Sequence, residues 1–422
     1  MRVLVNQLSA LSQRTGIGHY TSQLLRCLQA NAGMDVVDAF PNQWLWQAYR
    51  PYGAAIDYAR RLQRIRGRVS TTAAIAALAA LPRFALWQLN RVTSAAKRRY
   101  FDYVFSSDYY HLYHEPNYIP LSTVIPTIVT LHDLSVLLHP EWHPSERVKD
   151  FEKRFYVQLH HCCHFLTDSD SIRSEVIRLL GIPAARVTRV YLGVRPHMVP
   201  MAQEEVVRQL ARLDIQPNYI LYLGTVEPRK NLLMLMRTYC SLPRHLRERC
   251  PLLLVGKWGW RSATLASYYY EEARHLGVRH VDYVDDRCLP ALYNGARAMA
   301  FPSFYEGFGL PPVEMLACGG AVLASTAEVL KETVGGQAQL IDPDDGEAWR
   351  AALARVIEDD DFRDSLRAGA VGAARRFTWE ACAAETMRVY RLVAGESGLP
   401  THEVYDPRLA KAHVNDPLDT AA

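Results

Sequence analysis

The chain has 422 residues, of which 49% are hydrophobic and 22% are charged, and its formal net charge is +4 at pH 7. This length exceeds what one hydrophobic core usually supports, so we expect two domains of ordinary globular composition. A net charge this small gives no reason to expect nucleic acid as a partner.

The eight cysteines favour a reducing compartment. No two of them form a C-x-x-C pair and most lie in apolar periodic segments, so we expect neither a disulfide framework nor a zinc site. The N-terminal residues MRVLVNQL are typical of a strand and lack the charged and apolar regions of a secretory signal. The longest apolar run, 73–81, is too short to span a bilayer. These features together predict a cytoplasmic protein.

A strand predicted at residues 1–8 is followed by Gly16 and Gly18 and then by a helix to about Leu28. Glycine lets the backbone approach a ligand, and the N-terminus of a helix favours anions. A tight turn would explain the same two glycines. Thr21 replaces the third glycine of the G-x-G-x-x-G dinucleotide motif, which argues against an NAD-dependent oxidoreductase.

The segment from Trp44 to Tyr100 is rich in basic residues. Residues 50–99 contain eleven Lys or Arg and a single acid, Asp57, with aromatic residues between them. One interpretation is a solvated basic helix packed on its domain. Another is a helical insertion lying on an anionic membrane surface, where each basic residue could add about 1 kcal/mol. Nucleic acid is a poorer third possibility, because no recognition motif accompanies the charge.

A buried strand predicted at 124–131 ends at His132 and Asp133. Functional groups of open α/β sheets lie beyond the carboxyl ends of strands, so His132 is a candidate site residue, although an isolated histidine is more often structural. The next predicted strand end contains one of two D-x-D triplets, at 168–170 and 342–344. We expect both triplets to cap helices or turns, and we expect no metal.

A second series of strands and helices is predicted to begin at 219–223. The loop after this strand carries Glu227, Arg229 and Lys230. The two cations suit a diphosphate, because Arg supplies a two-pronged donor and Lys a point charge. The alternative is a basic helix start, which the helix dipole slightly disfavours. A later predicted strand, 280–284, is followed by two aspartates.

The segment 296–325 has the most informative spacing. An apolar strand at 296–302 leads into a loop with Glu306, and a helix opened by two prolines then carries Glu314 in its first turn. Carboxylates accept hydrogen bonds from hydroxyl groups, and free amides at a helix N-terminus donate to phosphate oxygens. The pattern therefore suits a phosphorylated sugar, although a glycine turn beside a dipole-compensating carboxylate would explain part of it.

The string S-F-Y-E-G-F-G-L-P-P-V-E at 303–314 closely resembles the donor-site signature of family 4 glycosyltransferases. T-L-H-D at 130–133 and G-T-V-E-P-R-K-N at 224–231 also resemble motifs of this family. The resemblance covers residues 1–28 and 103–393 and stops at the basic segment. It implies a retaining enzyme of the α/β class with the GT-B fold, in which two Rossmann-like domains face an interdomain cleft.

The resemblance also implies roles for individual residues. Glu314 would hold the ribose hydroxyls of a nucleotide sugar, and Glu306 would hold the transferred sugar. Arg229 and Lys230 would neutralise the departing diphosphate, and His132 would face the sugar near its anomeric carbon. The other expected donor-binding residues are Gly16 and Gly18 at the phosphates, Gly307, Phe308, Gly309 and Leu310 in the loop, and Val284 and Asp286 beside the base. An acid at 286 could accept hydrogen bonds from guanine, which weakly favours a GDP-sugar, but aspartate also starts helices routinely.

Four parts of the chain are expected. Residues 1–200 would form an acceptor-side domain interrupted by the basic insertion at about 45–100, and residues 215–375 a nucleotide-sugar domain. A terminal helix at 376–395 would return to the N-terminal domain, and a tail would follow at 396–422.

The predicted function is transfer of a hexose, mannose or a deoxyhexose such as rhamnose, from a nucleotide diphosphate sugar to a growing, lipid-linked bacterial surface polysaccharide such as a lipopolysaccharide O-antigen. The enzyme would act at the inner face of the cytoplasmic membrane without a cofactor. Two alternatives stay open: a sugar-nucleotide epimerase or phosphorylase-like enzyme on the same fold, and a non-catalytic scaffold of a polysaccharide-assembly complex.

Overall fold

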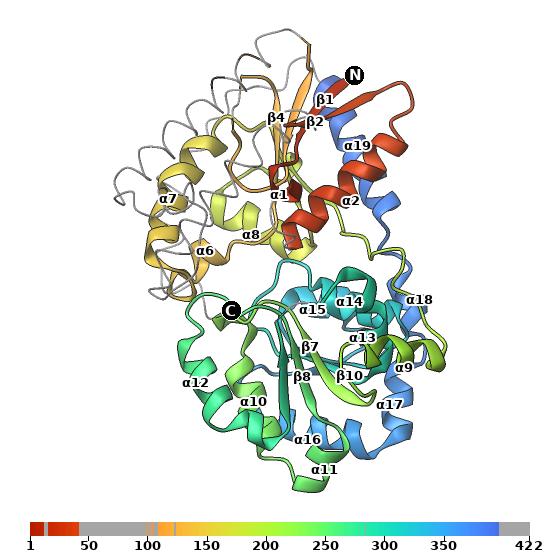
Figure 1. Cartoon of the computed structure of the whole chain (residues 1–422). Helices are drawn as coiled ribbons and strands as arrows, with labels where there is room; N and C mark the ends of the chain where they lie inside the picture. The colour runs from red at the N-terminus through yellow and green to blue at the C-terminus, as the bar shows by residue number, and fades with distance from the viewer. Residues whose placement is uncertain are drawn as a thin grey trace, which may run out of the picture. The chain divides into compact units, whose positions relative to one another are not determined.

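The computed structural model describes residues 1–11, 16–41, 99, 103, 109–121, 124–282 and 284–395. They form two six-stranded sheets and the helices that accompany them (Figure 1). The α/β class predicted from the sequence is therefore confirmed. The predicted basic insertion, apart from Arg99, and the predicted tail at 396–422 lie outside the described residues.

The first sheet has the strand order β2-β1-β3-β4-β5-β6. The pairs β1–β2, β1–β3, β3–β4 and β5–β6 are parallel. Every residue of β3, β4 and β5 is buried, as expected for parallel strands covered on both faces, which read as continuous apolar runs. The strands are β1 (Arg2–Asn6), β2 (Val36–Phe40), β3 (Leu112–Glu115), β4 (Thr127–Leu131), β5 (His164–Thr167) and β6 (Val187–Arg189).

The second sheet has the order β12-β11-β10-β7-β8-β9, and all its neighbouring strands are parallel. The chain order reverses between β10 and β7, so the loops that leave these two adjacent strands lie at the same edge. Ligands of open α/β sheets bind at such a reversal. The strands are β7 (Tyr219–Leu223), β8 (Leu252–Val255), β9 (Val278–Val281), β10 (Ala296–Phe301), β11 (Val322–Ser325) and β12 (Gln339–Ile341).

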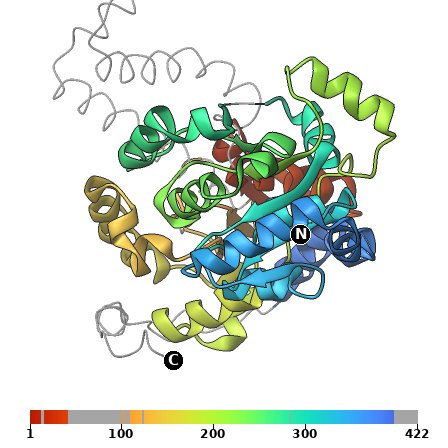
Figure 2. The ribbon, with the colours of Figure 1, turned by 90° about the horizontal axis from the view of Figure 1, so that it is seen from below.

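Helices cover both faces of the second sheet (Figures 1 and 2). Helix α10 contacts α16, and α13 contacts α9. Trp349 of α16 is fully buried, which anchors this helix in the core. The helices are α1 (Leu8–Leu11), α2 (Gly16–Ala30), α6 (Ser135–Leu138), α7 (Ser145–Leu159), α8 (Asp170–Leu180), α9 (Gln203–Ala211), α10 (Leu232–Cys240), α11 (Arg244–Arg249), α12 (Ala263–Glu271), α13 (Leu289–Gly295), α14 (Leu310–Ala317), α15 (Glu328–Val334), α16 (Gly346–Glu358), α17 (Asp360–Arg367), α18 (Ala370–Ala374) and α19 (Trp379–Gly395). None of the helices in the described part of the chain is both long and apolar enough to cross a membrane.

Most predicted strands are observed, and two local predictions are wrong. The strand predicted at 219–223 has these limits, and the one predicted at 296–302 is slightly shorter. The strand predicted at 280–284 is displaced to Val278–Val281, because Gly277, with φ of +97°, ends the preceding turn and the strand starts directly after it. Helix α2 begins at Gly16, so Gly16 and Gly18 lie in its first turn rather than in a loop before it.

The chain divides by its internal contacts into two compact units. The first contains Met1–Thr130, His161–His164 and the end of α19 from Met387, and the second contains Leu131–His160 and Phe165–Thr386. Within the first unit, the Tyr390 hydroxyl lies 2.6 Å from Nδ1 of His114, which ties the end of α19 to β3. The domain limits expected from the sequence stay a prediction.

Candidate active site

Three predicted site residues meet beyond the carboxyl ends of β7 and β10, within the second unit. Arg229 and Lys230 follow β7 in the 3₁₀ helix η3 (Pro228–Lys230), and Glu306 lies in the loop after β10. Nζ of Lys230 donates to Oε1 of Glu306, and Nη1 of Arg229 lies 3.3 Å from its Oε2. The backbone also joins the two loops, because the Phe304 N–H donates to the Arg229 carbonyl at 2.9 Å.

The cation pair is surrounded by carboxylates. Nε of Arg229 donates to Oε1 of Glu227 at 2.6 Å, and Nη1 lies 3.8 Å from Oδ2 of Asp133. Together with Glu306, three carboxylates therefore face two cations. Any anionic ligand of Arg229 and Lys230 would have to compete with these carboxylates, and above all with Glu306.

Burial and charge act in opposite directions on the pKa values of this cluster. Burial alone would lower the pKa of the Arg229 guanidinium, but the charges of Glu306, Asp133 and Glu227 raise it above its usual value. Burial would raise the pKa of Glu306, but Lys230 and Arg229 hold it below its usual value. Burial and the neighbouring Arg229 lower the pKa of Lys230, against the attraction of Glu306. Glu306 is thus held in its ionised form by its two cationic partners.

His132 follows β4, as predicted, and its partner is Asp168. Nδ1 of His132 lies 2.7 Å from Oδ2 of Asp168, and the two residues are only 7% and 3% exposed. Burial raises the pKa of Asp168, and the charge of His132 opposes this. The prediction that Asp168 caps a helix or turn is wrong: Ser169 caps α8 by accepting from the Ile172 N–H, and Asp168 instead orients the imidazole.

The loop that carries Glu306 lies directly against His132. A Cβ atom at Gly307 would lie 2.0 Å from the His132 carbonyl oxygen, so only glycine fits there. The Ser169 hydroxyl donates to the Gly307 carbonyl at 2.9 Å. His132 and Glu306 are therefore held on adjoining stretches of backbone.

Glu314, on α14, is fully buried and belongs to a second ionic group. Its two oxygens accept from Nε and Nη2 of Arg195 at 2.6 Å each, and Oε2 also accepts from the Tyr293 hydroxyl at 2.8 Å. Nη1 of Arg195 lies 3.5 Å from Oδ1 of Asp286. Burial alone would lower the pKa of Arg195, but the charge of Glu314 raises it. The structure thus brings together the predicted residues Glu314 and Asp286 through Arg195, which sequence reasoning missed.

The remaining predicted donor-binding residues lie at or just before the start of α14, in the buried core or in the first unit. Phe308 packs edge-on against Phe377 with ring centroids 5.4 Å apart, and Gly309, with φ of +81°, precedes Leu310, the first residue of α14. Val284 is buried. Gly16 and Gly18 belong to the first unit. The roles of all these residues in donor binding stay predictions.

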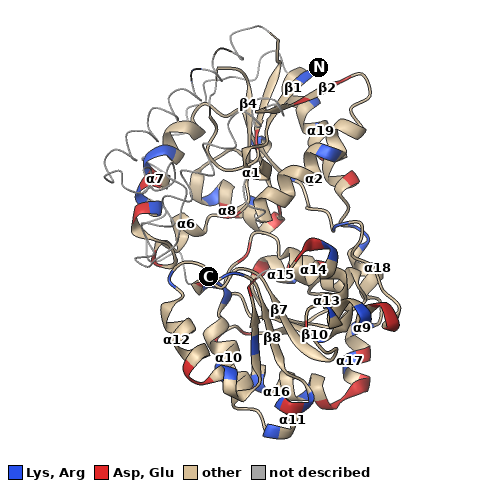
Figure 3. Ribbon diagram, in the orientation of Figure 1, with Lys and Arg blue, Asp and Glu red and all other residues tan. Residues whose placement is uncertain are grey.

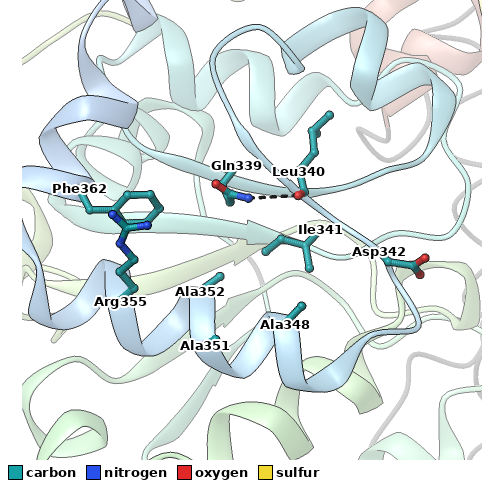
Figure 4. Close-up of a pocket in the computed structure, with 9 residues that line it drawn as sticks. All are labelled: Gln339, Leu340, Ile341, Asp342, Ala348, Ala351, Ala352, Arg355 and Phe362. Atoms are coloured by element: carbon teal, nitrogen blue, oxygen red, sulfur yellow. Dashed lines mark hydrogen bonds between the residues drawn. The ribbon is translucent and has the colours of Figure 1, made fainter.

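A cavity of about 400 Å³ lies between β12 and α16, away from the predicted site residues, none of which lines it (Figure 4). Among its lining residues, the Arg355 guanidinium lies 4.0 Å from the centre of the Phe362 ring. Asp342, of the second D-x-D triplet, lines this cavity and also accepts from the Asp344 N–H at 2.9 Å, the turn geometry that the sequence predicts. Within the described ranges, no group of three or more His, Cys, Asp or Glu side chains is arranged to hold a metal ion.

Two sequence families account for most of the chain. Residues 14–197 match the family described as Glycosyltransferase Family 4, and residues 204–371 match Glycosyl transferases group 1. The second match contains Arg229, Lys230, Glu306 and Glu314, and the first contains His132 and Asp168.

Relatives and solved structures agree with these matches. The O-antigen chain mannosyltransferase B of Escherichia coli is 37% identical over 284 residues, which are 67% of this chain and 74% of that protein. The serotype-specific mannosyltransferase WbdA of Escherichia coli is 29% identical over 260 residues, 60% of this chain but 32% of WbdA. Among solved structures, sucrose-phosphate synthase from Thermosynechococcus elongatus has a TM-score of 0.67 at 20% identity and covers 94% of this chain and 100% of its own.

Two further solved structures show the same fold. Anabaena HepE in complex with UDP and glucose has a TM-score of 0.65 at 17% identity, with 93% of this chain and 100% of HepE covered. WaaG, a glycosyltransferase involved in lipopolysaccharide biosynthesis, has a TM-score of 0.61 at 12% identity, with 92% and 99% covered. These similarities confirm the predicted GT-B fold. The family matches and the Escherichia coli relatives show that this chain belongs to glycosyltransferase family 4 and is a glycosyltransferase.

Proposed function

We propose that this glycosyltransferase moves a mannosyl residue from a nucleotide diphosphate sugar to a growing bacterial surface polysaccharide, with retention of the anomeric configuration. The choice of mannose is supported by the two Escherichia coli relatives, both of which are named mannosyltransferases. The single observation that carries the proposal is the meeting of Arg229, Lys230 and Glu306 beyond two adjacent strands. A deoxyhexose such as rhamnose is the second choice of sugar.

Donor binding would exchange one set of ionic contacts for another. Arg229 and Lys230 would bind the diphosphate by charge-assisted hydrogen bonds. Both cations contact Glu306 in this structure, so the diphosphate would take its place. The Glu306 carboxylate would then be free to accept from hydroxyl groups of the sugar. The two cations are thus paired with an anion with and without the donor, and Glu306 keeps hydrogen-bond partners in both states, which matters because a buried charge without partners is costly.

The chemical step would then proceed at the anomeric carbon. The bond between this carbon and the β-phosphate oxygen breaks, and its electron pair leaves with the diphosphate. Arg229 and Lys230 stabilise the charge that develops there, an electrostatic contribution to catalysis. The acceptor hydroxyl attacks from the same face and gives its proton to the departing phosphate. Glu306 and His132 position the sugar and form no covalent bond to it.

The proposed donor is a GDP-sugar. Asp286, held 3.5 Å from Nη1 of Arg195, would accept from the adjacent N–H groups of guanine, a pair of donors that uracil and thymine lack. The reaction would need no metal, because Arg229 and Lys230 provide the positive charge. HepE, which shares the fold, was solved with UDP and glucose, so the base is the part of the donor most in need of a direct test.

The proposed acceptor is a lipid-linked glycan at the inner face of the cytoplasmic membrane. Residues 50–99 carry eleven Lys or Arg against one acid, a composition that supports contact with anionic lipid. By contrast, acidic and basic positions stand side by side on α7 and α17, as on an ordinary solvated surface (Figure 3). Salt-sensitive binding of the full chain to anionic vesicles, weakened by Arg→Glu changes at 60, 61 and 64, would support the membrane contact, and salt-independent behaviour would oppose it.

The test of function is a transfer assay with a defined donor and acceptor. The full-length chain is incubated with GDP-mannose, UDP-glucose or dTDP-rhamnose and a synthetic oligomannoside, and the product linkage is read by NMR. We expect an α-linked mannoside from GDP-mannose and no product from the Glu306→Ala variant. A β-linked product would contradict retention, and a native, folded chain that transfers none of these sugars would contradict the proposed substrate class.

A further inference from the structure

The loop that carries Glu306 is attached on both sides of this residue to elements that follow β4 and β5. On one side, the Tyr305 hydroxyl donates to Oε2 of Glu175 at 2.5 Å and accepts from the Leu134 N–H at 3.0 Å. On the other side, Gly307 packs on the His132 carbonyl and accepts from Ser169. Glu306 lies between these two attachments.

We propose that Tyr305 and Glu175 form a latch, with Tyr305 as a positioning residue that sets Glu306 at the correct distance from His132. The proposal rests on the proposed role of Glu306 and pairs Tyr305, which lies in the 303–314 motif, with Glu175, which lies in no motif. Tyr305 does not itself need to touch the donor. It acts through the backbone, because its carbonyl accepts from Nη1 of Arg229 at 3.3 Å while its hydroxyl reaches α8 and Leu134, the residue before α6.

The bond from Tyr305 to Glu175 depends on the charge of Glu175. Burial raises the pKa of this carboxyl to about 7, with the Tyr305 hydrogen bond opposing the rise. The other charged groups that act on it are Asp133, which raises the pKa further, and Arg178 on its own helix, which lowers it. Above this pH the carboxylate accepts a charge-assisted hydrogen bond, and below it the bond becomes an ordinary neutral one. Burial has the larger effect on Glu175, however, and an opened loop lets water reach this carboxyl. The proton therefore favours the closed latch, which holds the loop more firmly at pH 6 than at pH 8.

The test compares three variants of the full chain. Tyr305→Phe keeps the ring and removes both hydrogen bonds, and Glu175→Gln keeps an acceptor oxygen without a charge. Tyr270→Phe, on an exposed position of α12, is the matched control. Two readouts are measured at pH 6 and pH 8: amide hydrogen exchange of residues 303–310, and turnover of GDP-mannose with its kcat and KM.

We expect Tyr305→Phe to speed exchange in 303–310 and to lower kcat by about tenfold or more, with a small change in KM, because both hydrogen bonds of the Tyr305 hydroxyl are lost. With exchange expressed as protection relative to the intrinsic rate at each pH, Glu175→Gln should remove the difference in protection between pH 6 and pH 8, and Tyr270→Phe should change neither readout. If Tyr305→Phe shows the same amide exchange in 303–310 and the same kcat as the native protein, the proposal that Tyr305 and Glu175 form a latch is contradicted. If the native chain turns over no GDP-mannose, the proposed function fails, while the exchange data still decide whether the latch exists.

Discussion

Arg195 holds the carboxylate of Glu314 through two parallel hydrogen bonds of 2.6 Å each, from Nε to Oε1 and from Nη2 to Oε2. Glu314 is 0% exposed and Arg195 7% exposed, so the pair is removed from water. A two-pronged contact of this kind is the strongest geometry available to an arginine and a carboxylate. The second glutamate of the donor signature is therefore also a structural anchor.

Replacing Arg195 with methionine should destabilise the protein strongly. The change leaves Glu314 as a buried carboxylate with Tyr293 as a partner but no cation, and breaking a buried pair from one side costs about 3–5 kcal/mol. The measurement is urea unfolding of the full chain. Arg287→Met is the control, because Arg287 forms a similar pair with Asp285 on the surface and should show no measurable change. Equal unfolding midpoints for the two variants would contradict the structural role of the Arg195–Glu314 pair.

The close contact between Gly307 and His132 predicts that a single methyl group added at Gly307 will lower the turnover of the enzyme. A Cβ at Gly307 would meet the His132 carbonyl oxygen at 2.0 Å, so Gly307→Ala should displace the Glu306 loop and lower turnover by about 100-fold or more. Gly336→Ala is a suitable control, because nothing lies within 4 Å of the Cβ added there. Turnover and melting temperature of both variants check the prediction. An active Gly307→Ala enzyme would show that the loop tolerates movement away from His132.

The sequence predicts much of the fold because its strands are continuous apolar runs. The runs at 219–223 and 296–302 mark two strands that prove to be neighbours, and the loops after them carry Arg229, Lys230 and Glu306. These residues meet because the loops that follow the strands of one parallel sheet all lie at the same edge of that sheet. The position of His132 after a strand could be predicted in the same way. Family membership then favours a glycosyltransferase over the epimerase and scaffold alternatives.

The partners of the site residues could not be predicted, because each lies far along the chain. Arg195 is 119 residues from Glu314, Glu175 is 130 from Tyr305, and Asp168 is 36 from His132. No local spacing relates such pairs, and an isolated Arg, Asp or Glu on an amphipathic helix is usually solvated. Asp168 was expected to be a cap because it stands beside a helix start, where Ser169 in fact provides the capping oxygen.

The raised pKa of Glu175 predicts an unusual dependence of the free energy of unfolding on pH. Its pKa is raised from 4.5 to about 7, so the folded protein holds this proton more tightly than the unfolded chain. The stabilising effect of the proton is complete below about pH 4.5 and is lost as pH rises through 7, and its full size is on the order of 3 kcal/mol. Glu175→Gln, which has no charge to bury, should therefore unfold at higher urea than the native protein at pH 8.

The same comparison at pH 4 should give nearly equal midpoints, because Glu175 is then mostly protonated in both the folded and the unfolded protein. Glu248→Gln, at an exposed position of α11, serves as the control and should behave like the native protein at both pH values. A Glu175→Gln variant that is less stable than the native protein at pH 8 would show that the carboxylate is stabilised by its partners rather than penalised by burial.

Binding of a nucleoside diphosphate compared with its monophosphate tests the central claim most directly. Titration calorimetry of GDP and GMP should show tighter binding of GDP to the native chain, because in the proposed complex Lys230 and Arg229 contact the β-phosphate that GMP lacks. In Lys230→Met the advantage of GDP should fall by about tenfold or more, while GMP affinity stays the same, since one charged contact to phosphate is worth about 1.5–3 kcal/mol. If Lys230→Met loses affinity for GDP and GMP equally, or keeps the native preference for GDP, the proposed placement of the diphosphate at Arg229, Lys230 and Glu306 is contradicted.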